Sequence, residues 1–177
     1  QTYIFPSAVA QQKAPDGYPT RWGGEPNADY DVDPDVAQSD VYRDRVLQGL
    51  RALPVVSISM PVDDIFGTAG LYSRTTSTTL EKQGSAEYFR PDPEQDGRNT
   101  KAGFALECGV KIQGGASRNP DSSIKHSMSL RFREQYGTDE LDYPLFDAED
   151  AVTRFNSIHL RAMYNNSWIH RDSSQQR

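Results

Sequence analysis

The chain has 177 residues, of which 36% are hydrophobic and 10% aromatic, so it suits one domain with a sizeable core and not a disordered segment. Its formal net charge of −6 argues against a general nucleic-acid-binding protein. No run of about 18 apolar residues is present, so we expect no transmembrane segment. The first residues do not form a signal peptide, and the single cysteine, Cys108, excludes an internal disulfide.

The first third of the sequence begins without clear periodicity. Residues 1–33 are rich in turn formers, so we expect an extended N-terminal segment that lies across a domain formed by residues 34–177. The aromatic side chains of this segment are expected to hold it in place; they are Tyr3, Phe5, Tyr18, Trp22 and Tyr30.

A run of aspartates at the end of this segment has two interpretations. Asp29, Asp31 and Asp33 have the spacing of the first three ligands of an EF-hand calcium loop. However, Pro34 replaces the required glycine, and Asp40 replaces the final glutamate. The alternative, which we favour, is that Asp33 caps a helix whose first residue is Pro34. A calcium-stabilised structural domain is therefore a rival hypothesis.

The pattern that follows predicts an α+β fold. Apolar residues at helical spacing indicate one long helix over about 34–53, ended by Pro54. About six short, mostly antiparallel strands follow it. The clearest is at 104–115, where one face holds Leu106, Cys108, Val110 and Ile112, and the other holds Glu107, Lys111 and Gln113.

Residues 112–132 read IQGGASRNPDSSIKHSMSLRF and predict a hairpin with a long turn. In its second strand His126, Met128, Leu130 and Phe132 share one face, and the opposite face holds Lys125, Ser127, Ser129, Arg131 and Arg133. Residues 98–133 carry seven basic and two acidic side chains, a net charge of +5, whereas 1–97 carry −7 and 134–177 carry −4. The hairpin thus presents an apolar face and a basic face.

The turn of this hairpin is a candidate phosphate site. Gly114 and Gly115 permit positive φ or a close backbone approach, and Lys125 stands beside them as a lysine does in protein kinases. The sequence does not form a Walker A loop or a Gly-x-Gly-x-x-Gly motif. From the residues alone the motif is weak, and a solvated lysine on an exposed sheet face is the commoner case.

The sequence gives little support for other catalytic or metal-binding sites. We predict that His126 and His159 lie on the apolar faces of their strands as core histidines, and not as catalytic bases. The sequence contains no HExxH, paired CxxC or GxSxG motif, and one cysteine cannot form a zinc cluster. No metal site and no catalytic residue is assigned.

Four segments carry a family resemblance. They are LPVVSISMPVDDIFG..GLY at 53–72, GVKIQGGASRNPDSSIKHSMSLRFREQYG at 109–137, LDYPLF at 141–146 and FNSIHLRAMYNNSW at 155–168. With these segments the chain resembles the N-terminal portion of the spore-coat protein H (CotH) kinase-like family, especially its large secreted or cell-surface bacterial members.

This resemblance implies the smaller, sheet-rich lobe of an atypical protein-kinase-like fold. It implies ATP and Mg²⁺ as cofactors, a protein substrate phosphorylated on Ser or Thr, and an extracellular or cell-surface location. It makes Lys125 the phosphate-contacting lysine. The loop beside it and the supporting contacts would come from Gly114, Gly115, Arg118, Arg131 and Arg161.

The chain also departs from the family. Members continue into a second lobe that carries the catalytic and metal-binding acidic residues, and we find none that match before Arg177. We therefore expect a nucleotide-binding portion of such a kinase that is inactive alone. The alternative from another class is a non-catalytic surface or matrix module that binds a protein or glycan through Tyr and Trp.

Overall fold

The computed structural model describes residues 2–21, 28, 30–91, 100–101, 103–121 and 125–162, with 100–101 described by their backbone. Trp22, Asp29 and the chain after 162 lie outside these residues. Of the helices that are described, none is both long and apolar enough to cross a membrane.

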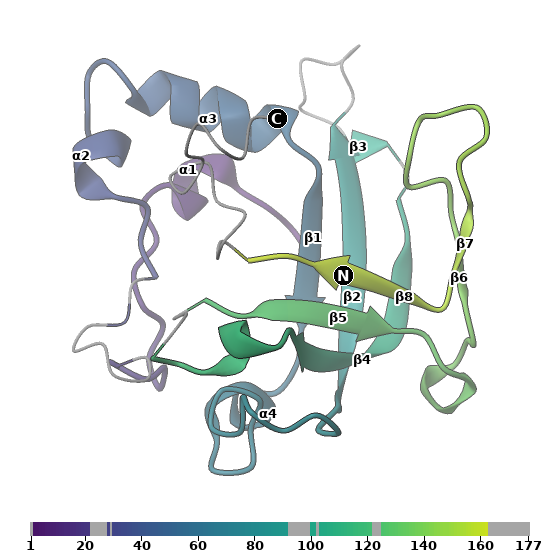
Figure 1. Cartoon of the computed structure of the whole chain (residues 1–177). Helices are drawn as coiled ribbons and strands as arrows, with labels where there is room; N and C mark the ends of the chain where they lie inside the picture. Colours follow the sequence, from purple (N-terminus) through teal and green to yellow (C-terminus); the bar gives the residue numbers. More distant parts are fainter. Residues whose placement is uncertain are drawn as a thin grey trace, which may run out of the picture.

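An antiparallel sheet is the centre of the structure (Figure 1). Its strands lie in the order β1 (Val55–Ser59), β2 (Lys82–Pro91), β4 (Ala105–Gln113), β5 (Ser127–Arg131) and β8 (Ser157–Leu160), and β3 (Thr100–Lys101) pairs with β2. A separate ribbon pairs β6 (Leu141–Asp142) with β7 (Arg154–Phe155). The predicted α+β class and mostly antiparallel sheet are confirmed.

The single helix predicted over 34–53 is wrong in its extent. The structure forms α2 (Pro34–Ala37) and α3 (Arg43–Ala52) instead, with a break between them. The hydroxyl of Ser39 accepts hydrogen bonds from the backbone N–H groups of Val41 (3.2 Å) and Tyr42 (3.3 Å). A serine that bonds to nearby backbone in this way competes with helical hydrogen bonding, so the chain turns here and starts a new helix.

The start of α2 agrees with the favoured interpretation of the aspartate run. The Asp33 carboxylate accepts a hydrogen bond of 2.9 Å from the backbone N–H of Asp35, and Pro34 is the first helical residue. Two other short helices are α1 (Pro6–Val9) and α4 (Val62–Phe66), and short 3₁₀ turns form at η2 (Ala116–Arg118) and η3 (Glu134–Tyr136).

The alternation predicted for the hairpin is present and places the core on one face of the sheet. In β4 and β5, Val110 lies opposite Leu130, which lies opposite Ile158 of β8. Side chains from the segment after α4 and from β6 cover this face. The buried core consists of Leu71, Ala86, Cys108, Val110, Ile112, Leu130, Phe132 and Leu141.

The opposite face of the same three strands is polar. We call it the polar face and define it by the residues that the register places there: Glu107, Lys111, Gln113, Ser127, Ser129, Arg131, Ser157 and His159, with Gly109 among them. Because one residue of slip would exchange the two faces, burial of the apolar set determines which side chains this face presents.

The N-terminal segment contacts the sheet and α4. The backbone N–H of Thr2 donates to a carboxylate oxygen of Glu87 at 3.0 Å. Tyr18 packs edge-on against Phe66, with ring centroids 5.3 Å apart, and against Tyr30 at 5.5 Å. By contrast, Tyr3 and Phe5 are 71% and 66% exposed, so these two expected anchors do not pack into the domain.

Substitutions at two glycines test the packing of the sheet and of α3. A Cβ at Gly109 would lie 2.4 Å from a Glu81 oxygen and 2.7 Å from the Tyr136 ring, whereas a Cβ at Gly49, in α3, has no atom within 4 Å. We expect Gly109→Ala to lower the free energy of unfolding by about 1–3 kcal/mol through overpacking. Gly49→Ala should raise it by about 0.5–1 kcal/mol. Urea denaturation measures both, and equal effects would contradict this packing.

Candidate functional site

The predicted phosphate loop is a turn at one end of the β4–β5 hairpin. It begins at Gly114, whose φ of +132° favours glycine. A Cβ there would also lie 2.3 Å from the hydroxyl oxygen of Ser117, whereas Gly115 has no atom within 4 Å of its Cβ position. The first glycine is therefore needed by the fold of the turn, and the second leaves the backbone open to an approaching group.

Arg118 holds this turn in place. Its Nε donates to the carbonyl oxygen of Gly114 at 2.5 Å, and its Nη1 donates to the carbonyl oxygen of Ser77 at 3.0 Å. These two bonds close the turn and tie it to the Ser/Thr-rich loop that precedes β2. Arg118, predicted to belong to the cofactor-binding loop beside Lys125, thus bonds to the protein backbone.

His126 connects the far end of the turn to the core. It is 6% exposed, and its Nδ1–H donates to the carbonyl oxygen of Ser117 at 3.0 Å. Its ring packs on Tyr72 with centroids 5.2 Å apart. Burial lowers the pKa of His126 below its ordinary value. It is a core histidine, as predicted, and the exposed Lys125 directly precedes it in the chain.

The structure separates the two arginines that were expected to support the site. Arg161 follows β8, and the backbone N–H of the next residue, Ala162, donates to the Ser127 hydroxyl at 2.9 Å, so Arg161 lies near the start of β5. Arg131 lies at the other end of β5, opposite Gly109 and Ser157. Arg131 is four residue steps along the strand from Ser127, about 13 Å. Arg131 is therefore not brought to the turn.

His159 is placed differently from the prediction. It is exposed and lies opposite Ser129 on the polar face, because Ile158 and Leu160 are the residues of β8 that pack against the core. Strict alternation along a strand leaves the residue between two core positions on the outer side. Lys111, Ser129 and His159 thus form one transverse row across three strands.

Lys111 and Ser129 were not predicted as site residues. The signal that identifies them was present in the sequence, because the alternation of the hairpin already placed them on its basic face. What was missing was the register, which determines that they lie directly opposite one another.

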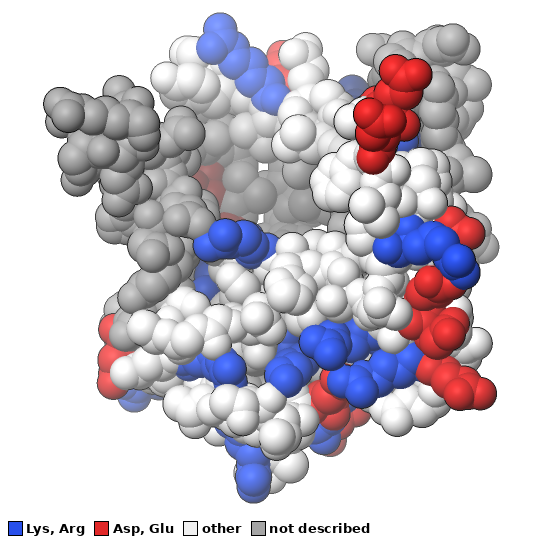
Figure 2. All heavy atoms as spheres, turned by 45° about the vertical axis from the view of Figure 1, so that its right-hand side comes forward, with Lys and Arg blue, Asp and Glu red and all other residues white. Residues whose placement is uncertain are grey.

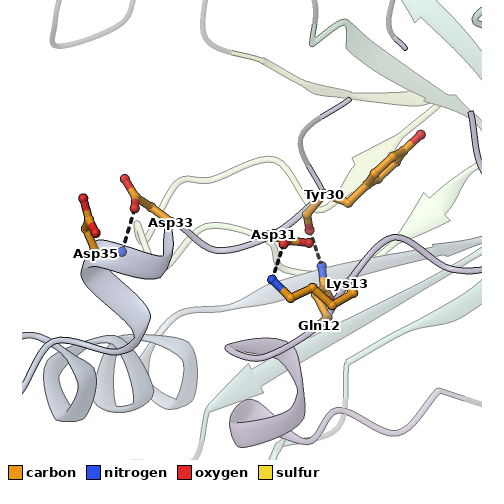
Figure 3. Close-up of polar contacts among 6 residues, drawn as sticks. All are labelled: Gln12, Lys13, Tyr30, Asp31, Asp33 and Asp35. Carbon is orange, nitrogen blue, oxygen red and sulfur yellow. Dashed lines mark hydrogen bonds and ion pairs between the residues drawn. The ribbon is translucent and has the colours of Figure 1, made fainter. Parts of the chain in front are cut away.

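The aspartates do not converge on a calcium site. Figure 3 shows the Asp31 side chain directed to Lys13, with 2.5 Å between the ammonium and a carboxylate oxygen, while Asp33 is directed to the start of α2. Asp29 lies outside the described residues. Within the described parts of the chain, no group of three or more His, Cys, Asp or Glu is placed to hold a metal ion. The calcium hypothesis finds no support in these carboxylates.

Cys108 is not a nucleophile candidate. Its side chain is fully buried, and burial raises the pKa of the thiol to about 11. At neutral pH it is therefore protonated and serves as a small core residue.

Figure 2 shows a face on which basic side chains are frequent, with acidic side chains among and beside them. Lys and Arg side chains gather across its lower half, and Asp and Glu side chains lie mostly along its right-hand side. Asp147, after β6, forms an ion pair of 2.7 Å with Arg90 of β2. The surface thus has a basic region on which an anion can bind.

Comparisons of the chain with protein-family models, with curated proteins and with solved structures found no match. The functional proposals below therefore rest on the residues and their geometry.

The buried histidine makes the turn sensitive to acid. The pKa of His126 is lower in the native state than in the unfolded state, so the unfolded chain takes up a proton more readily. The contribution of His126 to the free energy of unfolding should therefore be fully present above about pH 6.5 and should be lost as the pH falls through the native pKa. We expect His126→Asn, which keeps a donor but does not titrate, to show a shallower loss of stability between about pH 7 and pH 5. Urea denaturation at each pH measures this. His159→Gln is the control, and a wild-type slope in His126→Asn would contradict the prediction.

Proposed function

We propose that this chain is the nucleotide-binding lobe of a CotH-like atypical Ser/Thr protein kinase, and that it holds the phosphates of ATP at the turn between β4 and β5. The observation that supports the proposal is a glycine turn that is hydrogen-bonded at Gly114 and Ser117 and open at Gly115, with the exposed Lys125 just before β5. Lys125 is exposed, and the residue after it is hydrogen-bonded into the turn at Ser117.

Rigidity of the turn supports a binding role. A phosphate site needs donors that stay in position, since ordering them on binding costs free energy. Here Arg118 and His126 fix the turn from both ends through bonds of 2.5 to 3.0 Å to Gly114, Ser77 and Ser117. Gly115 keeps the backbone accessible, and Lys125 supplies a charge that complements a triphosphate.

The residues present fit the phosphates of ATP better than they fit its metal. Lys125 and Arg161 both lie toward the turn end of the sheet. The one carboxylate described in the turn itself, Asp121, is exposed and is not part of a metal-binding group among the described residues. A metal ion requires several oxygen ligands, so we assign no residue here to Mg²⁺ and derive no step through it.

Titration with ATP tests this proposal. We expect ATP to raise the melting temperature of the 177-residue chain, and Lys125→Ala to weaken binding about tenfold or more, because a charge-assisted hydrogen bond of about 1.5–3 kcal/mol is lost. Differential scanning fluorimetry and isothermal titration calorimetry measure the two effects.

Arg51→Met is the matched control, since it removes an exposed cation from α3, outside the proposed site. Equal affinity in the wild type and Lys125→Ala would show that the turn is not the site. Absence of ATP binding to the wild type would remove the proposed function.

A second candidate function is a surface module that binds a glycan or protein without catalysis. The observation that favours it is the exposure of aromatic side chains, with Tyr3, Phe5 and Phe146 more than 60% exposed. Aromatic residues are enriched among the anchors of binding surfaces.

Calorimetry with soluble oligosaccharides tests this second function. The variant Tyr3→Ser/Phe5→Ser should keep the stability of the wild type, because both side chains are exposed, and should lose binding. A wild type that binds no oligosaccharide, or a variant that binds equally well, would contradict a glycan-binding role for these two residues.

A further inference from the structure

Two half-buried cations on the polar face have no ion pair with any residue that the structure describes. Lys111 is on β4 and Arg131 on β5, and no hydrogen bond or ion pair joins either side chain to another described residue. A lysine and an arginine that are partly withdrawn from water lose hydration, and this loss is normally offset by a partner. Lys111 and Arg131 are therefore suited to bind an anion.

Between them lies a buried hydroxyl. Ser129 is 0% exposed, and its Oγ has no hydrogen-bond partner in the described structure. Ser129 is opposite Lys111 in the register and two residues before Arg131 on the same face. Buried side-chain oxygens nearly always have a partner, so an unsatisfied one beside two cations indicates a group that binds there.

The spacing of the three residues suits one phosphate group. Residues directly opposite on antiparallel strands have Cβ atoms about 5 Å apart, and diagonal neighbours are about 7–8 Å apart. Two residues along one strand span about 7 Å. Lys111, Ser129 and Arg131 therefore form a small triangle whose flexible basic side chains can converge on an anion above the hydroxyl.

The nearest carboxylates do not neutralise this triangle. Glu81 is 13% exposed and is committed to Arg133, at 3.2 Å, and to the hydroxyl of Tyr136, at 3.0 Å. It reaches these partners across Gly109, where a side chain would block it. Glu107 also lies on the polar face, but it is exposed and lies opposite Ser85 of β2. A further titratable neighbour, His159, is exposed at the edge of the row.

We propose that Lys111, Ser129 and Arg131 form a binding site for the phosphate group of a phosphomonoester on the polar face of the sheet. This site is separate from the turn at Lys125, because Arg131 lies at the opposite end of β5. It does not depend on the proposed nucleotide-binding function. Ser129 becomes the neutral donor, and rotamer changes of the long neighbouring side chains open the way to it.

Thermal denaturation with inorganic phosphate, at constant ionic strength and against chloride, tests the site in the 177-residue chain. Phosphate should raise the melting temperature of the wild type, and Lys111→Met and Arg131→Met should each weaken its binding about tenfold or more. Ser129→Ala should raise the melting temperature without phosphate, since it removes an unsatisfied hydroxyl, yet weaken phosphate binding. A purely structural role of Ser129 would leave phosphate binding unchanged.

Two matched variants and a second probe complete the test. Arg51→Met removes an exposed cation from α3 and should bind phosphate as the wild type does. Equal phosphate shifts in every variant, or none in the wild type, would overturn the proposal. Loss of binding in Lys125→Ala but not in Lys111→Met would place phosphate at the turn and overturn it too. O-phospho-L-serine should bind with similar affinity, and its failure to bind would rule out a phosphomonoester.

Discussion

The pairing of β4 with β5 is the constraint on which the rest of the structure depends. In this pair Val110 lies opposite Leu130 and Ile112 opposite Met128, so four apolar side chains meet on one face. Removing apolar surface from water provides the main driving force for this arrangement. The same register necessarily places Lys111 opposite Ser129 and Arg131 opposite Gly109 on the other face. Burial of the core therefore determines which side chains the polar face presents. Contacts among the polar side chains are not needed to place them there.

The hairpin turn is built by a second kind of interaction. Arg118 and His126 are residue types often found in binding sites, yet here they bond to backbone carbonyls and hold a glycine turn against the loop before β2. A carbonyl that is partly withdrawn from water needs a donor, and these side chains supply it where no strand does. With the turn held by these hydrogen bonds, Gly115 and Lys125 remain at the surface. The two proposed phosphate sites thus share one hairpin, one at its turn and the other from the middle of the paired strands to Arg131.

Prediction from the sequence succeeded where a local rule and the tertiary structure agree. Alternation identified both hairpin strands and their faces, and the Asp33–Pro34 pair identified the start of α2. It failed where a single side chain changed the local balance. Ser39 caps the break between α2 and α3, so the helix expected over 34–53 is divided. His159 was assigned to the core because its neighbours are apolar, although those neighbours themselves pack inward and leave it outside.

The sequence by itself determined the α+β class, the two-faced hairpin and the concentration of positive charge around it, because these follow from periodicity and composition alone. Only the tertiary structure decided which of the basic residues act together. Lys125 and Arg161 come to the turn end of the sheet, whereas Arg131 joins Lys111 and Ser129. The physical reason is register: hydrogen bonding between strands, and not distance along the chain, sets which side chains are neighbours.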